Sequence, residues 1–302
     1  MDMTDMTRAA VSRRHFLQLA GAGMLALTGT ALTGCGNSTS GEGSDKGSKL
    51  AAIKSRGHLN AGVKKDVPGY GYYDTAKGRF EGMEVDLCYQ IAAAVFGVSY
   101  KEARAQELVE FTDVTPKTRG PLIDNGQLDV VAATYTITDE RKKAVDFSSS
   151  YYNDSQSVVV KKDSKFANAT KVSDLKDATV GVMVGTLAYD YAKANIKDDI
   201  QTFNDDAALA QALDAGQIDV LVTSTVECVY MVQSEQVKDS KVLGRLPDSE
   251  DKSGMGIVLP KDSKLTAAVT KAVDDLNADG TIKKLQDKWL AEYTTDLTEL
   301  KK

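Results

Sequence analysis

The chain has 302 residues, of which 42% are hydrophobic and 26% are charged, and its formal net charge at pH 7 is −6. This length can hold two domains, and the composition argues against a disordered chain and against a protein with several membrane spans. The acidic balance argues against nucleic acid as a partner. Beyond the N-terminal segment His58 is the only histidine, so zinc and serine-hydrolase chemistry have almost nothing to use, and we expect no metal and no cofactor.

The first 34 residues have the pattern of an export signal. Residues 1–16 are polar and include Arg13 and Arg14, whereas residues 17–34 are apolar and rich in small side chains. A charged segment, an apolar segment and a cleavage site make up a secretory signal peptide. The stretch SRRHFLQ (12–18) resembles a twin-arginine export motif, although a generic basic segment would look the same, so the export route stays open.

The signal ends in LTGC (32–35), which resembles a bacterial lipobox with Cys35 as the lipidated residue. The following residues, GNSTSGEGSDKGS, have the composition of a flexible linker and cannot pack into a core. We therefore expect a signal peptide at 1–34 and a tether at 35–49. Lipidated Cys35 would hold a folded body at the outer face of the bacterial cell membrane.

From Leu50 onward, predicted strands and helices alternate in two series. The first series consists of strands at 58–63, 107–114 and 128–134, helices at 82–97, around 121–125 and at 139–145, and an extended run at 155–163. The second consists of strands at 178–185, 199–204, 218–223 and 254–260 and helices at 186–194, 207–215, 226–233, 265–278 and 281–293. Alternation of this kind predicts an α/β fold with mostly parallel sheets flanked by helices.

Two near-copies of one sequence support two lobes built on one plan. GQLDVVAATYT (126–136) and GQIDVLVTST (216–225) each place a glycine after a helical segment, then an apolar run, then hydroxyl side chains. For one copy alone, chance repetition in an α/β protein would be the preferred explanation. We expect lobe 1 at 50–150 and 256–302, lobe 2 at 156–250, and a hinge formed by the extended segments 151–155 and 251–255.

Ligands of open α/β sheets bind beyond the carboxyl ends of the strands. The segment TYTITDER (134–141) follows such a strand, with Thr138 as a helix N-cap and Arg141 as a fork of donors suited to a carboxylate. Arg141 could instead belong to a solvated basic face, ERKK. Thr186, after Gly185, belongs to a second strand-to-helix turn, whose backbone N–H groups could reach the same anion. Alternatively, the glycine and the threonine serve only as a structural turn and helix cap.

Three stretches of the chain form a further pattern: GVKKDVPGYGYYDTAKGRFEGMEVDL (62–87), TRGPLIDNGQLDVVAATYTITDERKKAVDFSSSYY (118–152) and GVMVGT (181–186). Together they resemble bacterial ABC-transporter receptors for polar amino acids, the family-3 solute-binding proteins. The similarity extends over roughly residues 50–295, and the TITDER…DFS block is its most specific part. The resemblance implies a type II periplasmic-binding-protein fold that closes over its ligand without catalysis, an ABC permease with its ATPase as partners, and a monomer.

The resemblance also implies roles for individual residues. Arg141 would clamp the α-carboxylate of an amino acid with help from Thr136 and the backbone near Thr134, and Thr186 would contact it from the other lobe. Lys64 and Arg119 occupy positions that tend to hold the distal carboxylate in the glutamate/aspartate branch. Two such cations would favour an acidic ligand, by about 4 kcal/mol per close pair before desolvation is subtracted, unless they are only surface charges.

One position departs from the family pattern. Many relatives place an aspartate after the second lobe's strand to pair with the ligand ammonium, but this chain has Ser224 there. Glu227, or carbonyls and hydroxyls, could take over, or the ligand could lack the α-amino group. Tyr72, or its neighbours Tyr70 and Tyr73, could pack on the aliphatic part of the ligand or simply on the protein.

The sequence thus favours an extracytoplasmic receptor that captures an acidic or polar amino acid, with glutamate preferred, and delivers it to an ABC importer. The alternative is an enzyme on the same fold, a dehydratase of cyclic carboxylates, for which Glu227 or Asp66 would be the general acid. A third alternative is a ligand-binding domain of a sensory protein, but the predicted lipobox speaks against it. Cys88 and Cys228 could form a disulfide, but their apolar contexts favour two small buried side chains.

Overall fold

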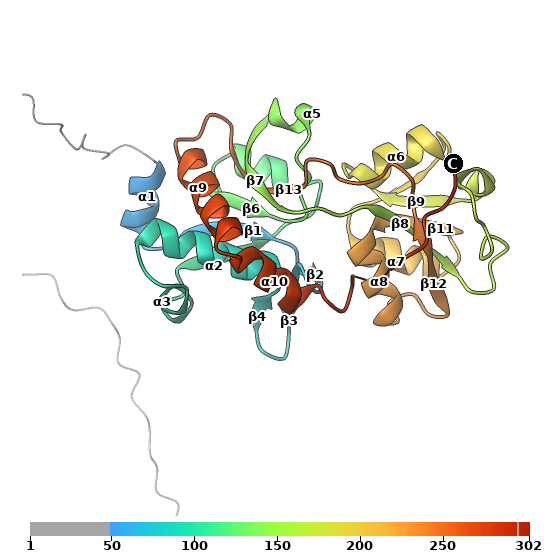
Figure 1. Ribbon diagram of the computed structural model, residues 1–302, viewed down its shortest axis with the longest axis horizontal. Coiled ribbons are helices and arrows are strands. Elements are labelled where there is room, and N and C mark those ends of the chain that lie inside the picture. Colours follow the sequence, from blue (N-terminus) through green and yellow to red (C-terminus); the bar gives the residue numbers. More distant parts are fainter. Residues whose placement is uncertain (1–48, 295) are drawn as a thin grey trace, which may run out of the picture. The chain divides into compact units, whose positions relative to one another are not determined.

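The computed structural model describes residues 49–294 and 296–302 (Figure 1). The predicted signal peptide, the predicted lipidation of Cys35 and all but the last residue of the predicted tether lie outside the described residues. Within the described part, none of the helices is both long and apolar enough to cross a membrane.

Two five-stranded sheets form the centres of two lobes. The first sheet has the strand order β5-β1-β6-β13-β7. In it β1 pairs in parallel with β5 and β6, whereas β13 pairs antiparallel with β6 and β7. Its strands are β1 (Leu59–Val63), β5 (Val109–Asp113), β6 (Val130–Ala132), β7 (Val145–Tyr152) and β13 (Met255–Pro260).

The second sheet repeats this plan with the order β10-β9-β11-β8-β12. Here β9 pairs in parallel with β10 and β11, and β8 pairs antiparallel with β11 and β12. Its strands are β8 (Gln156–Lys161), β9 (Val180–Met183), β10 (Gln201–Phe203), β11 (Val220–Ser224) and β12 (Ser240–Arg245). The predicted two-lobed α/β fold with mostly parallel sheets is therefore confirmed, and in each sheet one strand, β13 or β8, runs antiparallel to the other four.

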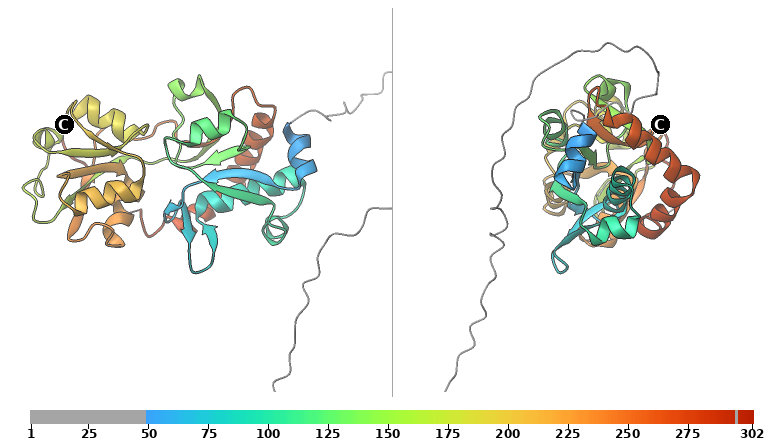
Figure 2. Two further views of the ribbon diagram at one scale, coloured as in Figure 1. Left: turned by 180° about the vertical axis from the view of Figure 1, so that it is seen from behind. Right: turned by 90° about the vertical axis from the view of Figure 1, so that its left-hand side faces the viewer.

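Both faces of each sheet are buried, which explains the continuous apolar runs in the sequence. In β8, Val158 and Val160 pack into one core and Val159 into another. In β6, Val130 and Val131 likewise face opposite cores of the first lobe. Helices cover these faces in both lobes, as Figures 1 and 2 show.

The helices divide between the two lobes. Residues of α1 (Lys49–Arg56), α2 (Met83–Phe96), α9 (Leu265–Ala278) and α10 (Thr281–Trp289) enter the largest core of the first lobe, together with Ala103 of α3 (Tyr100–Ala105). Residues of α6 (Leu187–Asn195), α7 (Asp206–Asp214) and α8 (Thr225–Gln233) enter the cores of the second lobe, which also contains the short 3-10 helix Val172–Leu175. The short helices α4 (Arg119–Asp124) and α5 (Asp139–Lys142) follow β5 and β6 of the first lobe.

The two near-copies of the sequence occupy equivalent places. The first copy connects α4 to β6 and the second connects α7 to β11, and each of these strands is the central strand of its sheet. Gly126 and Gly216 have φ angles of 79° and 69°, the left-handed conformation in which a glycine ends a helix. The interpretation of both copies as the helix-to-strand half of a βαβ unit is therefore correct.

A small antiparallel sheet after β1 was not expected from the sequence. It consists of β2 (Asp66–Val67), β3 (Gly71–Asp74) and β4 (Arg79–Glu81). The chain can fold back here because Gly82 has a φ angle of 132° and lies against the backbone of Tyr70, where a Cβ atom would come within 2.2 Å of the Tyr70 carbonyl oxygen.

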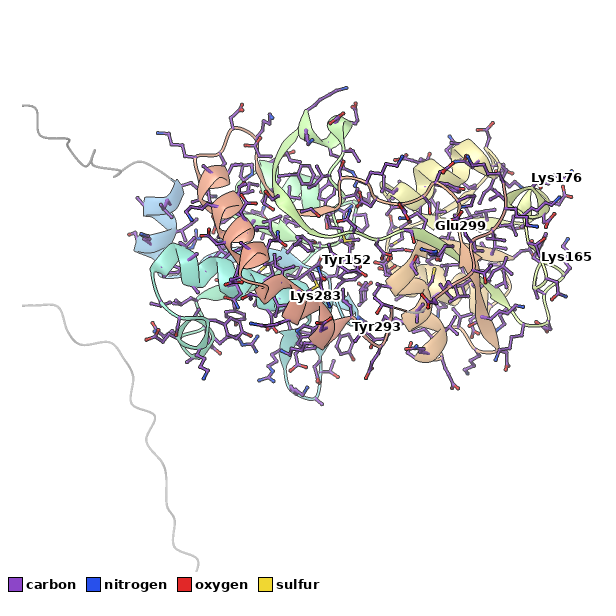
Figure 3. All side chains as sticks on the ribbon, in the orientation of Figure 1. Tyr152, Lys165, Lys176, Lys283, Tyr293 and Glu299 are labelled. Carbon is purple, nitrogen blue, oxygen red and sulfur yellow. The ribbon has the colours of Figure 1, made fainter. Side chains whose placement is uncertain are left out.

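Two connections join the sheets, and they overlap the predicted hinge segments 151–155 and 251–255. The chain leaves the first sheet after Tyr152 and enters the second at Gln156, and it returns between Arg245 and Met255. Movement about these segments and the predicted lobe boundaries remain predictions. One contact differs from the assignment of 256–302 to lobe 1, because Glu299 and Lys301 form β-bridges with Arg245 and Lys171 of the second lobe (Figure 3).

Both described cysteines, Cys88 and Cys228, are free thiols buried in the cores of different lobes. The interpretation of these residues as small buried side chains is confirmed.

Candidate functional site

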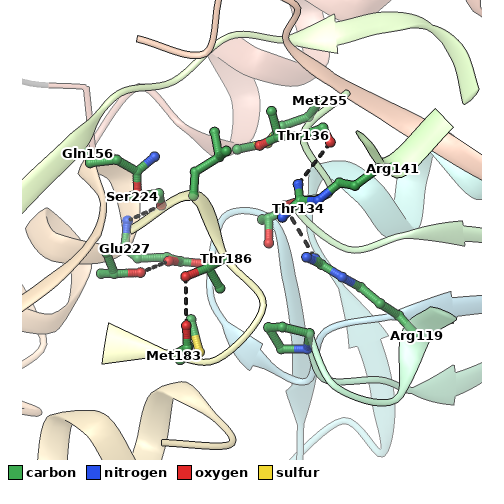
Figure 4. A pocket seen from close by; sticks show the side chains of 13 residues that line it. Arg119, Thr134, Thr136, Arg141, Gln156, Met183, Thr186, Ser224, Glu227 and Met255 are labelled. Atoms are coloured by element: carbon green, nitrogen blue, oxygen red, sulfur yellow. Dashed lines mark hydrogen bonds between the residues drawn. The ribbon is translucent and has the colours of Figure 1, made fainter. Parts of the chain in front are cut away.

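A cavity of about 390 Å³, part of it open to solvent, lies at the edges where the two sheets present their strand ends (Figure 4). Both lobes contribute to its lining, which consists of Pro116, Arg119, Thr134, Thr136, Arg141, Gln156, Met183, Thr186, Leu187, Thr223, Ser224, Glu227 and Met255. Six of the eight predicted ligand-binding residues are therefore brought together here.

Arg141 lies at the third position of α5, where Thr138 caps the helix by accepting a hydrogen bond from the Arg141 backbone N–H at 3.1 Å. Its guanidinium donates to the carbonyl of Thr136 at 2.9 Å and to the carbonyl of Gly185, in the other lobe, at 3.0 Å. Burial lowers the pKa of Arg141 from its usual value, but the group stays charged at any physiological pH. The sequence placed this side chain correctly at the edge between the lobes.

Arg119 is the first residue of α4 and is only 2% exposed. Its guanidinium donates to the carbonyl of Ala133 and stacks 3.7 Å from the centre of the Tyr135 ring, on which Arg141 also lies at 4.6 Å. The described residues offer no hydrogen-bond partner to its Nε. Burial, and then the nearby charge of Arg141, lower the pKa of Arg119 to about 10. Two guanidinium groups beside one aromatic ring form a wall suited to anionic groups.

The turn after β6 is fixed by a buried carboxylate. Thr134 has the unusual φ angle of 47°, and its backbone N–H donates to Glu84 at 2.6 Å. The Tyr151 hydroxyl donates to the same carboxylate, whose pKa is raised by burial. Glu84 therefore occupies the Thr134 N–H, while Thr134 itself still lines the cavity, and the predicted contact between a ligand and the backbone near Thr134 stays a prediction. The next lining residue, Thr136, is 6% exposed and forms an antiparallel β-bridge with Met255.

Thr186 lies at the corresponding turn of the second lobe. Its hydroxyl donates to the carbonyl of Met183 at 2.8 Å and accepts from the backbone N–H of Tyr189 at 3.2 Å, so it caps α6. The N-terminal end of a helix carries a partial positive charge. Thr186 and Leu187 thus present the start of α6 to the cavity.

The end of β11 and the first turn of α8 contribute three further residues, Thr223, Ser224 and Glu227. Ser224 caps α8 by accepting a hydrogen bond from the backbone N–H of Glu227 at 3.4 Å. The Thr223 hydroxyl donates to the carboxylate of Glu227, which is 3% exposed. Burial raises the pKa of Glu227, while the charge of Lys64 and the hydrogen bond from Thr223 act in the opposite direction.

Two predicted site residues do not line the cavity. Lys64 is buried, with 1% exposure, because its ammonium group pairs with Asp206 at the start of α7 and lies 3.6 Å from Asp66. Tyr72 lies on β3 of the small sheet and is 38% exposed. The structure therefore corrects the expectation that these two side chains touch a ligand in this cavity.

Several lining residues were missed. Gln156 and Met255 begin the two strands that cross between the sheets, and Met183 and Leu187 flank the turn at Thr186. The predicted hinge segments could have indicated Gln156 and Met255, since crossing strands begin at the cleft. The described residues contain no group of three or more His, Cys, Asp or Glu placed to hold a metal.

A cleft between two α/β lobes, with guanidinium groups on one wall and helix N-termini on the other, defines a protein that encloses a small anionic or zwitterionic molecule. Comparison with known proteins agrees with this class. Residues 59–292 match the family model of the bacterial extracellular solute-binding proteins, family 3. The chain belongs to this family and has its type II periplasmic-binding-protein fold.

Individual relatives resemble the chain over most of its length. The chain is 32% identical to the ABC transporter glutamine-binding protein GlnH of Bacillus subtilis (strain 168) over 86% of this chain and 92% of that protein. It is 29% identical to the glutamate-binding protein GluB of Corynebacterium glutamicum over 92% and 91% of the two chains. Among solved structures, the ancestral amino-acid-binding protein AncCDT-1, a precursor of cyclohexadienyl dehydratase, superposes with a TM-score of 0.68 at 29% identity, covering 80% of this chain and all of that one.

Proposed function

We propose that the protein is an extracytoplasmic receptor that captures an acidic or polar α-amino acid, with glutamate preferred, and delivers it to an ABC importer without catalysing a reaction. The observation that carries this proposal is the position of Arg141, whose guanidinium lines the cavity and contacts backbone carbonyls of both lobes. A carboxylate bound there would receive paired, charge-assisted hydrogen bonds from this fork. Membrane anchoring through Cys35 is part of the proposal.

The preference for glutamate rests on Arg119. Its charge lies close to that of Arg141 in a buried setting, and this repulsion is relieved when anionic groups approach. Glutamate brings two carboxylates to a wall with two guanidinium groups, whereas glutamine brings one. Lys64 does not support this preference directly, since its charge is taken up by Asp206. The relatives include both a glutamine-binding and a glutamate-binding protein, so affinity must decide between the two ligands.

Isothermal titration calorimetry of residues 36–302 with the twenty amino acids tests the proposal. We expect glutamate to bind most tightly, with a dissociation constant below 1 mM. Arg141→Met should weaken binding by roughly 100-fold, because it removes a buried charge-assisted pair, and Arg141→Lys should weaken it less.

The matched control is Arg79→Met on β4, where the arginine is exposed and pairs with Glu81. This variant should bind like the unmodified protein. Absence of binding below millimolar concentration for every amino acid would reject the ligand class. Unchanged affinity in Arg141→Met would reject the site.

An enzyme on this fold remains the second candidate, because Glu227 is a buried carboxyl group with a raised pKa that lines the cavity and could act as a general acid. Asp66, the other candidate named from the sequence, does not line it. Incubation with prephenate and with arogenate, followed by detection of an aromatic product, tests this activity. We expect no product above the uncatalysed rate.

A further inference from the structure

We propose that Glu227 is the residue that binds the ammonium group of the ligand and thereby makes the receptor select α-amino acids over simple dicarboxylic acids. This inference rests on the proposed function, since it assigns a role within the same cavity. It begins from a physical requirement, because an ammonium group removed from water without an opposite charge is strongly destabilised.

Among the described residues that line the cavity, Glu227 is the one that carries a carboxylate. Ser224, at the end of β11, presents only a hydroxyl, and that hydroxyl already accepts the backbone N–H of Glu227. Asp66 and Asp206 lie nearby, but they contact Lys64 and do not line the cavity. The negative charge available to a ligand cation is therefore that of Glu227.

The local structure holds this carboxylate in place. Glu227 is at the third position of α8, directly after the N-cap Ser224, and the Thr223 hydroxyl donates to its Oε2. The Ser224 side chain also interacts with this carboxylate, which has enough lone pairs to accept a further donor. In Figure 4 the Glu227 side chain lies near Ser224 and Thr186, across the cavity from Arg119 and Arg141.

The distribution of charge across the cavity matches a zwitterion. Two guanidinium groups belong to the wall formed by the first lobe, and the Glu227 carboxylate belongs to the wall formed by the second. An α-amino acid placed between them would direct its carboxylate to Arg141 and its ammonium to Glu227. Each charge would then be paired on desolvation, and closure of the lobes would bring the pairs together.

The surroundings of Glu227 leave it incompletely neutralised. Burial raises its pKa, as does the charge of Asp154, while Lys64 and the Thr223 hydroxyl lower it. Lys64 forms its close ion pair with Asp206 and also faces Asp66, so three carboxylates share one ammonium. A second cation, supplied by the ligand, would stabilise the ionised form of Glu227.

Glutamate and glutarate provide the test, because glutarate has the same two carboxylates and lacks the ammonium. Calorimetry should show that the unmodified protein binds glutamate at least about 100-fold more tightly than glutarate, as expected when a buried charge loses its partner. Glu227→Gln should weaken glutamate binding roughly 100-fold and leave glutarate binding unchanged or tighter. The ratio of the two affinities should fall close to one.

Asp66→Asn is the matched control. It removes the same charge from the neighbourhood of Lys64 without altering the lining of the cavity. This variant should keep the preference for glutamate. If Asp66→Asn abolishes the preference, or if Glu227→Gln retains it, the assignment is wrong and Glu227 serves only the Lys64 cluster.

The pH dependence of the unmodified protein gives a readout that needs no variant. Binding of an ammonium lowers the pKa of Glu227 in the complex, so affinity for glutamate should be full above the pKa of the free protein and fall as pH drops through it. Affinity for glutarate should not fall in this way. If Glu227→Gln does not fold, Glu227→Asp should retain the preference with reduced affinity, and loss of the preference in that variant contradicts the assignment.

The outcomes separate the two proposals. A protein that binds no amino acid contradicts the proposed function and, with it, this assignment. A protein that binds glutamate and glutarate equally, or whose preference survives Glu227→Gln, leaves the receptor function intact and contradicts the role of Glu227 alone.

Discussion

At the scale of single residues, Asp154 shows how burial controls a charge in the segment that connects the lobes. Its carboxyl group accepts hydrogen bonds from the Ser155 N–H at 2.7 Å, the Tyr70 hydroxyl at 3.2 Å and the Val226 N–H at 3.4 Å. Burial nevertheless dominates and raises the pKa of Asp154 from 3.8 to about 6. The folded chain therefore holds this proton more tightly than the unfolded chain does.

We predict a loss of stability with rising pH from this residue. A carboxyl group with a raised pKa in the folded state contributes stability below the unfolded pKa of about 4, and that contribution is lost as pH rises through the folded pKa. Between pH 5 and pH 8, the ionisation of Asp154 should lower the free energy of unfolding by about 1 kcal/mol. Urea unfolding of Asp154→Asn should show a pH dependence smaller by this amount than that of the unmodified protein.

Other buried carboxyl groups, such as Glu84, are present in both proteins, so the difference isolates Asp154. Equal pH dependence in the two proteins would show that Asp154 does not hold its proton in the folded state.

Site residues could be predicted from the sequence where a short, continuous motif marks them. Arg141, Thr186 and Ser224 could be predicted because each belongs to a strand end followed by a capped helix, and all three line the cavity. Lys64 could not be placed in this way. Its partner Asp206 is 142 positions further along the chain, and no local pattern indicates such a pair.

At the scale of elements, the first turn of α6 contributes both to the stability of the helix and to the lining of the cavity. Thr186 ends the turn after β9, caps the helix and lines the cavity with its neighbour Leu187. The position of this helix end depends on the two hydrogen bonds of one hydroxyl group, to Met183 and Tyr189.

We predict that Thr186→Ala lowers the free energy of unfolding by about 1 kcal/mol, the usual effect of losing an N-cap side chain. It should also weaken ligand binding several-fold, because the first turn of α6 is less well held. Urea unfolding and calorimetry measure the two effects. Thr186→Ser keeps the cap and should restore both, and a Ser variant as impaired as the Ala variant would contradict a capping role.

The sequence predicted the core strands and helices but not the peripheral ones. Apolar runs buried on both faces, such as β8 and β11, give a strong signal that does not depend on their neighbours. The strands of the small sheet β2–β3–β4 are short and partly exposed, and most residues of the edge strand β12 are only partly buried, so these residues carry little pattern. The fold of the small sheet depends on the contact between Gly82 and Tyr70, which the sequence does not reveal.

At the scale of the whole folded body, one buried ion pair links the lobes. Lys64 follows β1 of the first lobe and pairs with Asp206 at the start of α7 in the second. Burial alone would lower the pKa of Lys64, but the charges of Asp206, Asp66 and Glu227 raise it above its usual value. Lys64 therefore stays charged, and its ion pair with Asp206 joins the two lobes.

We predict that Lys64→Met lowers the free energy of unfolding by about 3 kcal/mol, because it leaves Asp206 buried without its partner. The double variant Lys64→Met with Asp206→Leu should recover most of this loss, since both charges are then absent. Urea unfolding of the single and double variants measures the coupling. Additive losses would contradict a direct interaction between the two residues.

The overall plan of two similar lobes could be predicted because the chain repeats its order of elements. The single antiparallel strand in each sheet and the position of the last residues could not be predicted. Both depend on pairing between segments far apart in the sequence, as between β13 and β7 or between Glu299 and Arg245.

The β-bridges of Glu299 and Lys301 have a practical consequence. The described chain starts with α1, whose Ile53 is buried in the first lobe, and it ends beside the second lobe. Its two ends therefore report on different lobes. Fluorescent dyes attached at Lys49 and Lys302 would convert any relative motion of the lobes into a change in energy transfer, so that ligand capture could be followed in a single molecule without altering the cavity.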